Sequence, residues 1–210
     1  GLEGVAMAIW PVSLVIIAAV FTYNLCIATG SMEKIKKVLT GVSKDRRILL
    51  LLIGWGFGGF LEGMAGFGTA VAIPAGILCG LGFSPIPATV ACLVANATPT
   101  AFGSVGIPTV TLAQLTEISQ GSLAWNTTVQ LLPLILITPF VMVIIEGKSV
   151  RALKGIWPIT LASGIAFAVP ELLAARFLGA ELPVIIGSVC SMAVMILMAR
   201  KNPQSREKEY

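Results

Sequence analysis

Glu62 is the residue of this chain that is best placed to do chemistry. It is the only formally charged residue between Arg47 and Glu117, and seven of the fifteen residues in the segment 54–68 are glycine. A carboxyl group inside a membrane is costly unless it is neutral, paired or exposed to a polar cavity. Removal from water also disfavours its charged form. Glu62 is therefore a candidate proton-coupling residue, and the alternative is a neutral glutamate that hydrogen-bonds neighbouring helices together.

A glycine-rich segment directly after Glu62 predicts a break in a helix. It contains Gly63, Gly66 and Gly68 and is followed by Thr69, near which we expect a new helix to start. Irregular backbone at membrane depth is tolerated only where protein or an aqueous cavity satisfies its polar groups. Free amides and the dipole at a helix N-terminus attract anions. We therefore expect these four residues to bind the carboxylate of a substrate.

A second polar cluster follows about thirty residues later. Its proline, Pro99, should break the helix that arrives there and leave carbonyl groups free. The side chains that could supplement those carbonyls are Asn96, Thr98, Thr100 and Ser104. Such a set suits a hydroxyl-bearing substrate or a sodium ion, and the alternative is a proline kink whose polar groups bond to one another.

Composition places these clusters in a membrane. The chain has 210 residues, of which 56% are hydrophobic and 11% charged, and its mean hydropathy is +0.93. Soluble domains carry about 25% charged residues. We therefore predict an all-α polytopic integral membrane protein, a transmembrane helix bundle with Gly/Pro-interrupted or re-entrant helices. The net charge of +4 lies in short loops, where it sets membrane orientation, so we expect no nucleic-acid partner.

The residue types needed for metal binding or enzymatic catalysis are scarce. The chain has no histidine and a single aspartate, Asp45. Its four cysteines lie in apolar segments without metal-ligand spacing: Cys26, Cys79, Cys92 and Cys190. Neither a nucleophile–base pair nor a metal-ligand set is visible. We therefore expect no cofactor and no metal site, and we do not favour a membrane enzyme.

Long apolar runs predict the membrane spans. Outside the central stretch they cover residues 5–29, 123–145, 156–178 and 183–199. Basic residues concentrate in the loops 30–47 and 146–155 and in the tail 200–210, which the positive-inside rule assigns to the cytoplasm. The segment 113–121 carries Glu117 and no basic residue, so we place it outside.

These assignments restrict the central stretch, residues 48–112, which we take as the substrate and coupling core. It begins inside and ends outside, so it crosses the membrane an odd number of times. Three crossings are one solution. The other is one full crossing plus a re-entrant hairpin of short half-helices, which we favour because the segment 69–83 is short for a span of about 30 Å.

A second carboxylate within a predicted span, Glu171, lies five residues from Arg176. This spacing places the two side chains poorly on one helical face. Because both lie toward the outer end of their span, we expect them to reach the membrane interface and not the bundle interior.

The central motifs resemble those of the L-lactate permease family. The resemblance rests on FLEGMAGFG at residues 60–68, LGFSP at 81–85, and the segment 96–108 that ends in AFGSVGIP. Weaker similarity extends over most of the chain. It implies a permease that imports L-lactate, and often glycolate, by proton symport through a bacterial inner (plasma) membrane.

The resemblance also implies a longer protein, because members of this family extend beyond both ends of such a chain. We therefore expect residues 1–210 to form a single transmembrane domain that requires the remaining half of the permease. The other partners expected are lactate or glycolate, protons and membrane lipids. Alternatives are an anion channel, a sodium-coupled carboxylate transporter, and a partial permease that does not transport.

Overall fold

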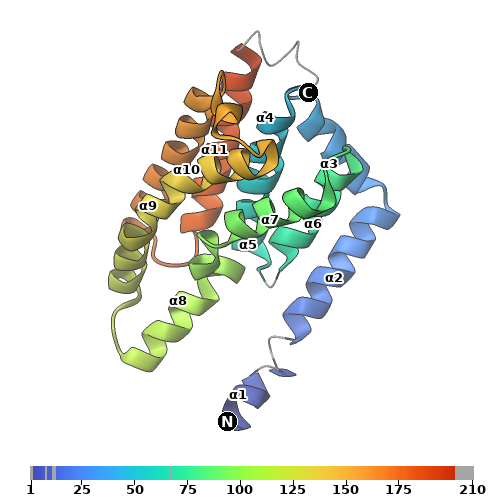
Figure 1. Ribbon diagram of the computed structural model, residues 1–210. Helices are drawn as coiled ribbons and strands as arrows, with labels where there is room; N and C mark the ends of the chain where they lie inside the picture. Colours follow the sequence, from blue (N-terminus) through green and yellow to red (C-terminus); the bar gives the residue numbers. More distant parts are fainter. Residues whose placement is uncertain (1, 8, 11–12, 67, 202–210) are drawn as a thin grey trace. The chain divides into compact units, whose positions relative to one another are not determined.

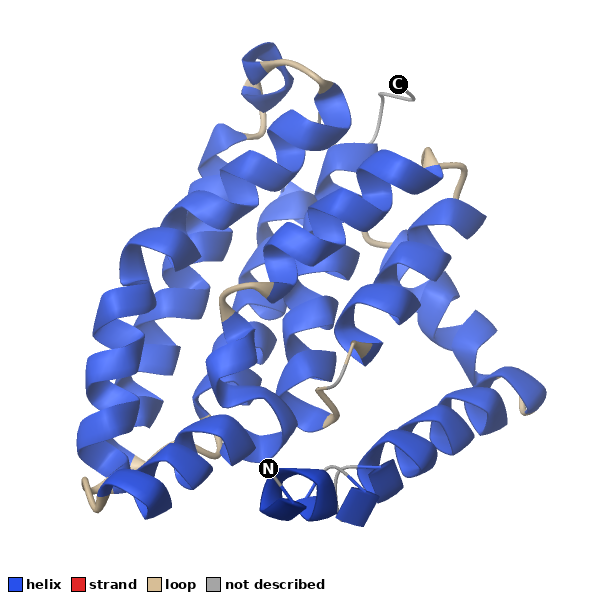
Figure 2. Cartoon of the chain, turned by 60° about the horizontal axis from the view of Figure 1, so that its bottom comes forward, coloured by secondary structure: helices blue, strands red, loops and turns tan. Residues whose placement is uncertain are grey.

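A computed structural model describes residues 2–7, 9–10, 13–66 and 68–201. Across these residues the chain forms helices joined by short loops, and no strand is present (Figure 2). The all-α fold predicted from composition is therefore confirmed. The chain divides into two compact units, Gly1–Val38 and Leu39–Tyr210. The single domain expected over residues 1–210 remains a prediction.

The first unit contains α1 (Leu2–Met7), α2 (Ser13–Ala28) and most of α3 (Ser31–Thr40). Helix α2 covers 16 residues of the expected span 5–29, and Ala8, Pro11 and Val12 of that span lie outside the described residues. The prediction of a polar loop over 30–47 is wrong for its first part, which is α3. That helix carries Glu33 in its first turn and Lys37 in its last, which suits the helix dipole.

The central span of the second unit begins just before the expected core. It consists of α4 (Arg46–Leu50), the π-helical turn η2 (Leu51–Phe57) and α5 (Gly58–Met64). Asp45 caps its start by accepting a hydrogen bond of 2.9 Å from the backbone N–H of Arg47. Within this span 72% of the most apolar window is buried inside the protein, compared with 33% for the long helix α9. The sequence stretch around Glu62 is therefore the best-covered part of the bundle.

Two short helices follow the central span and form a hairpin. They are α6 (Thr69–Gly80) and α7 (Pro85–Asn96), each of 12 residues, which is about 18 Å at helical rise. Arg46 donates a hydrogen bond of 2.8 Å to the carbonyl of Gly82, and its guanidinium lies 4.3 Å from the centre of the Phe83 ring. The hairpin therefore returns to the end of the bundle where the central span begins. Its short helices agree with the alternative of half-helices.

After α7 the chain bends sharply. The 3₁₀ turn η3 (Pro99–Phe102) leads into α8 (Gly103–Thr116), and the bend between α7 and the segment Pro99–Thr116 is 54°. This bend lies where Pro99 predicted a helix break.

Three long helices complete the second unit. They are α9 (Gln120–Gly147), α10 (Trp157–Phe177) and α11 (Pro183–Lys201), and they lie side by side with the 3₁₀ turn η4 (Val150–Leu153) between α9 and α10 (Figure 1). Each coincides with a predicted span. Among the described residues, four helices are long and apolar enough to cross a membrane, or five if α7 and α8 with the bend count as one.

The basic segments of the second unit gather at one end. Arg47 pairs with Asp45 at 2.7 Å and also donates to the carbonyls of Ala152 and Lys154. Arg46 lies 3.9 Å from Glu146 at the end of α9. This common location is what the alternating topology requires. The cytoplasmic assignment of this end is still a prediction, and residues 202–210 of the tail lie outside the described residues.

Candidate functional site

Glu62 lies near the C-terminal end of α5 and is buried, with 3% of its surface exposed. Its side chain faces Gly103, at the start of α8. A Cβ atom at position 103 would lie 2.5 Å from Oε1 of Glu62. Among the described residues, Oε2 of Glu62 has no hydrogen-bond partner. A buried polar atom without a partner is uncommon in proteins and marks Glu62 as a candidate for a group that exchanges protons.

The predicted break after Glu62 is present. Helix α5 ends at Met64 and α6 begins at Thr69, as expected from the glycines. Gly66 and Gly68 have φ values of +60° and +84°, a backbone conformation that favours glycine.

Gly63 has a different position from the one expected. It lies inside α5, where a Cβ atom would lie 2.8 Å from Cγ1 of Ile185. Its absence of a side chain therefore allows α5 and α11 to pack closely.

Two amides of the expected carboxylate cradle already have acceptors. Gly66 donates its N–H to Leu61 at 3.3 Å, and Thr69 donates its N–H to Gly66 at 3.1 Å. The hydroxyl of Thr69 also bonds to the carbonyl of Gly66, at 2.7 Å. In this conformation these groups satisfy the break internally, so an anion could use them only after a rearrangement.

The second break contains strained backbone. Ser104, Val105 and Gly106 have φ values of +48°, +57° and +78°. A β-branched residue such as Val105 rarely adopts positive φ, and strain of this kind concentrates at functional sites.

The two breaks touch through Ser104. Its hydroxyl donates a hydrogen bond of 2.7 Å to the carbonyl of Ala65. A Cβ atom at Gly66 would lie 3.1 Å from the backbone nitrogen of Ser104. Together with the contact between Gly103 and Glu62, these contacts form what we call the break junction: Glu62, Ala65, Gly66, Gly103 and Ser104.

The remaining residues of the second cluster bond locally. The Asn96 amide donates to the Thr100 hydroxyl at 3.4 Å, and that hydroxyl donates to the carbonyl of Asn96. Thr98 donates to Ala95 at 3.4 Å. These bonds are those of the alternative reading, a proline kink with satisfied polar groups, although Oδ1 of Asn96 has no partner among the described residues.

Glu171 is a functional candidate that the sequence interpretation placed wrongly. It was expected at the membrane interface, but it is fully buried on α10, with 0% exposure. Both of its carboxyl oxygens lack a hydrogen-bond partner among the described residues. Of the two residues expected at the interface, Arg176 is the exposed one, and its guanidinium lies 5.5 Å from the centre of the Trp125 ring. The position near the end of a span suggested solvent access, and no sequence signal showed which helix face Glu171 occupies.

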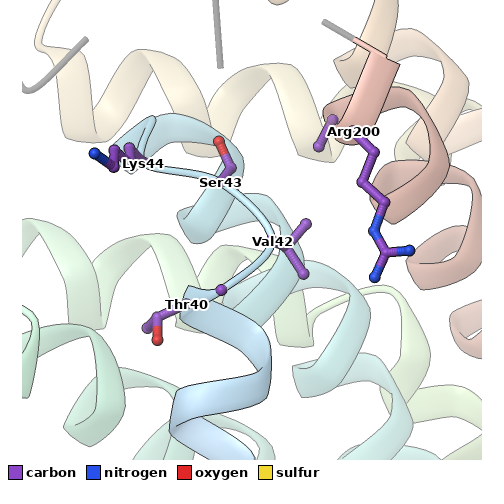
Figure 3. Close-up of a pocket in the computed structure, with 7 residues that line it drawn as sticks. Thr40, Val42, Ser43, Lys44 and Arg200 are labelled. Atoms are coloured by element: carbon purple, nitrogen blue, oxygen red, sulfur yellow. The ribbon is translucent and has the colours of Figure 1, made fainter. Parts of the chain in front are cut away.

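A pocket of about 580 Å³ lies at the basic end of the bundle, away from the break junction. It is lined by residues 40–44 with Ala199 and Arg200. Figure 3 shows the Lys44 side chain directed away from Arg200, on the other side of the turn. The charged groups that line this pocket do not converge on one point, which a small-anion site would need.

Comparison with known proteins gives a consistent result. A sequence model of the family described as L-lactate permease matches residues 1–209. An L-lactate permease of Streptococcus iniae is 53% identical over 206 residues, which are 98% of this chain and 44% of that protein. An L-lactate permease of Escherichia coli K12 is 38% identical over 94% of this chain and 36% of its own length.

A glycolate permease, GlcA of Escherichia coli K12, is 37% identical over 94% of this chain and 35% of its own length. The chain thus spans less than half the length of these curated relatives. No solved structure matches the chain.

Proposed function

Because this chain belongs to the L-lactate permease family, we propose that it forms part of a secondary transporter that imports L-lactate and related 2-hydroxy monocarboxylates such as glycolate. The family consists of permeases, which are transporters and not enzymes, and the apolar helices make the chain a multi-pass membrane protein. Import across the bacterial plasma membrane would be driven by proton symport.

The observation that carries the proton coupling is the position of Glu62. It is a buried carboxyl group, 3% exposed, in the most deeply covered span, and within the break junction it lies against Gly103. A carboxyl group in such a place binds and releases protons only when its surroundings change. Opening of the junction would expose Glu62 and couple protonation to the conformational state, as alternating access requires.

The same opening would create the substrate site. Separation of Ser104 from the carbonyl of Ala65, together with loss of the bonds from Gly66 to Leu61 and from Thr69 to Gly66, would free backbone groups for the substrate carboxylate at Gly66, Gly68 and Thr69. The hydroxyls of Thr98, Thr100 and Ser104 and the amide of Asn96 would be within the same bend for the 2-hydroxyl. Gly63 would act through the packing of α5 on α11.

The second half of the site would come from outside this chain. The residues 48–112 contain no lysine or arginine to neutralise an anionic substrate. The curated relatives are more than twice as long as the matched region, so we assign a cationic partner group to the part that those relatives have in addition. Lipids would surround the bundle, with the basic end at the cytoplasm.

The test is uptake of labelled L-lactate into proteoliposomes under an imposed inward proton gradient. Glu62→Gln removes the charge with little change in size, and Glu117→Gln makes the same change at an exposed position. We expect accumulation to be lost in Glu62→Gln and retained in Glu117→Gln, in the natural full-length protein and in this chain if it transports alone.

Three results would contradict parts of this proposal. Full accumulation by Glu62→Gln would exclude Glu62 as the coupling residue. Accumulation driven by a sodium gradient but not by a proton gradient would show that the coupling ion is sodium and not the proton. Uptake that only follows the lactate gradient, whatever the proton gradient, would identify a channel.

A further inference from the structure

Glu171 is the most completely buried carboxyl group among the described residues, and the transport scheme above does not use it. Its exposure is 0%, and neither oxygen has a hydrogen-bond partner there. It faces α11 at Gly187, where a Cβ atom would lie 3.2 Å from Cβ of Glu171. Packing of α10 on α11 therefore encloses this carboxyl group.

The packing around Glu171 places it at the level of Glu62. One turn before it on α10, Phe167 stacks on Trp55 with ring centres 4.6 Å apart and fills the space beside Gly59. One turn after Gly59 on α5 are Glu62 and Gly63. Both helices run away from the basic end of the bundle, since Arg47 bonds to Ala152 just before α10. Glu62 and Glu171 therefore each lie about one helical turn farther from the basic end than the contact between Gly59 and Phe167.

Helix α11 packs against both α5 and α10. Gly63 packs on Val184 and Ile185, and Glu171 packs beside Gly187, which also contacts the carbonyl of Phe167. The segment 184–187 of α11 therefore contacts both helices that carry a buried glutamate. A shift of this short segment away from α10 would uncover the carboxyl group of Glu171, whereas that of Glu62 faces Gly103 at the start of α8.

Glu171 has no basic partner among the described residues, and the guanidinium of Arg176, five residues later on α10, lies over the Trp125 ring. Helix α10 packs against α9, α11 and η2. Their titratable groups are Glu146, Cys190, Arg200 and Lys201, and no ion pair to Glu171 is formed among the described residues. An isolated carboxylate in such a place would cost several kcal/mol. The neutral, protonated acid is the form that this environment accepts.

We propose that Glu171 is a second proton-binding group of the transport cycle, protonated in the conformation described here and deprotonated when α11 moves away from α10. The step is the binding or release of one proton by one carboxyl group, with no other bond formed or broken. This inference rests on the proposed proton symport, and it adds a second proton site, on α10, to that of Glu62 on α5.

The competing explanation is a permanently neutral glutamate that only fills space. Glu171→Gln separates the two, because glutamine has nearly the same size and cannot release a proton. A space-filling residue would tolerate this change. A proton-binding residue would not, because the cycle could no longer deprotonate this site.

The experiment uses the natural full-length protein in proteoliposomes, with Glu171→Gln, Glu62→Gln and the exposed control Glu117→Gln. We expect Glu171→Gln to lose gradient-driven accumulation of labelled lactate but to keep exchange of internal for external lactate, which needs no net proton movement. Unchanged accumulation in Glu171→Gln would overturn the proposal.

Infrared difference spectroscopy gives a readout that does not depend on transport. We expect the parent protein to show a protonated-carboxyl band that is missing in Glu171→Gln, and this band should diminish when lactate is added. If the parent protein fails to accumulate lactate, the proposed symport fails, yet the band still tests Glu171. A band that is absent, or unaffected by lactate, would overturn the inference.

A second variant covers the case in which Glu171→Gln does not fold. Glu171→Asp keeps the carboxyl group and shortens its stem by one methylene. We expect its protonated-carboxyl band to be shifted and its accumulation slowed but present. A normal rate with no change of the band would contradict a role for this side chain.

Discussion

Glu62 and Gly103 illustrate how closely a single side chain is fitted at the break junction. The carboxyl group occupies the space that any side chain at position 103 would need. The glycine is therefore required by the position of Glu62 and not by its own backbone, whose φ is −60°. Residues of this kind cannot be recognised from the sequence, because the two positions are 41 residues apart and neither shows its partner.

Gly103→Ala should disturb the site directly. The added methyl group would collide with Oε1 of Glu62, and overpacking of this kind costs about 1–3 kcal/mol. We expect a lower thermal unfolding midpoint in detergent and a large loss of lactate uptake.

Gly76→Ala is the matched control for that variant, because it lies in α6 with nothing within 4 Å of the added Cβ. We expect it to keep uptake and to gain up to about 1 kcal/mol of stability from its helix propensity. Equal behaviour of the two variants would show that the space beside Glu62 is not restricted.

The sequence prediction agrees with the structure for residues that can be recognised from their neighbours in the sequence. Glu62 stood out because it interrupts a long apolar run, and Thr69 because it follows a cluster of glycines. Glu171 was misplaced because five residues separate it from Arg176 near a span end, and the facing direction of a helix depends on packing. The partner of Ser104 could not be foreseen, because Ala65 lies 39 residues earlier.

At the scale of elements, the two helix breaks form one unit. Each is followed by a helix that contains a proline, Pro74 in α6 and Pro108 in α8. The hydroxyl of Ser104 joins the two breaks. Two helix breaks that are far apart in the sequence therefore touch in the structure.

Ser104→Ala tests this connection between the breaks. Loss of the hydroxyl leaves the Ala65 carbonyl without this donor, which costs about 1–3 kcal/mol at a buried site. Alanine keeps the Cβ atom at this position, so the variant removes only the hydroxyl group. We expect a lower unfolding midpoint together with a changed ratio of lactate exchange to net uptake.

Thr116→Ala serves as the control, since it removes an exposed hydroxyl that bonds to Leu112 at 2.7 Å within the last turn of α8. Surface changes of this kind usually stay within about 0.5 kcal/mol. A loss of stability as large as that of Ser104→Ala would indicate a general sensitivity of α8.

At the scale of the whole second unit, the basic loops lie at one end and the loops that are poor in basic residues lie at the other. Arg46, Arg47 and the carbonyls of Ala152 and Lys154 meet at one end. At the other end, the α10–α11 loop contacts the start of α8, because a Cβ atom at Gly106 would meet the backbone of Ala180 and Glu181. The alternation of basic and basic-poor loops predicted this arrangement, whereas the lengths of the half-helices came from the structure.

Cysteine labelling in intact cells tests the orientation of the two ends. With the four natural cysteines replaced by serine or alanine, we expect Glu117→Cys to react with a membrane-impermeant thiol reagent from outside. Lys148→Cys should react only after the cells are permeabilised. Both positions are exposed, so access to the reagent depends on the side of the membrane. The reverse pattern would invert the proposed topology.

The π-helical turn Leu51–Phe57 has a mechanical consequence. At its end the N–H of Gly58 bonds to the carbonyl of Ile53, five residues earlier, so this turn holds one residue more than an α-helical turn. Conversion to α-helical bonding would advance the register of everything beyond it by one residue. One residue corresponds to a rotation of about 100° around the helix axis. The carboxyl group of Glu62 would then rotate away from α8 toward another neighbouring helix, while Arg46, which precedes the turn, stayed in place.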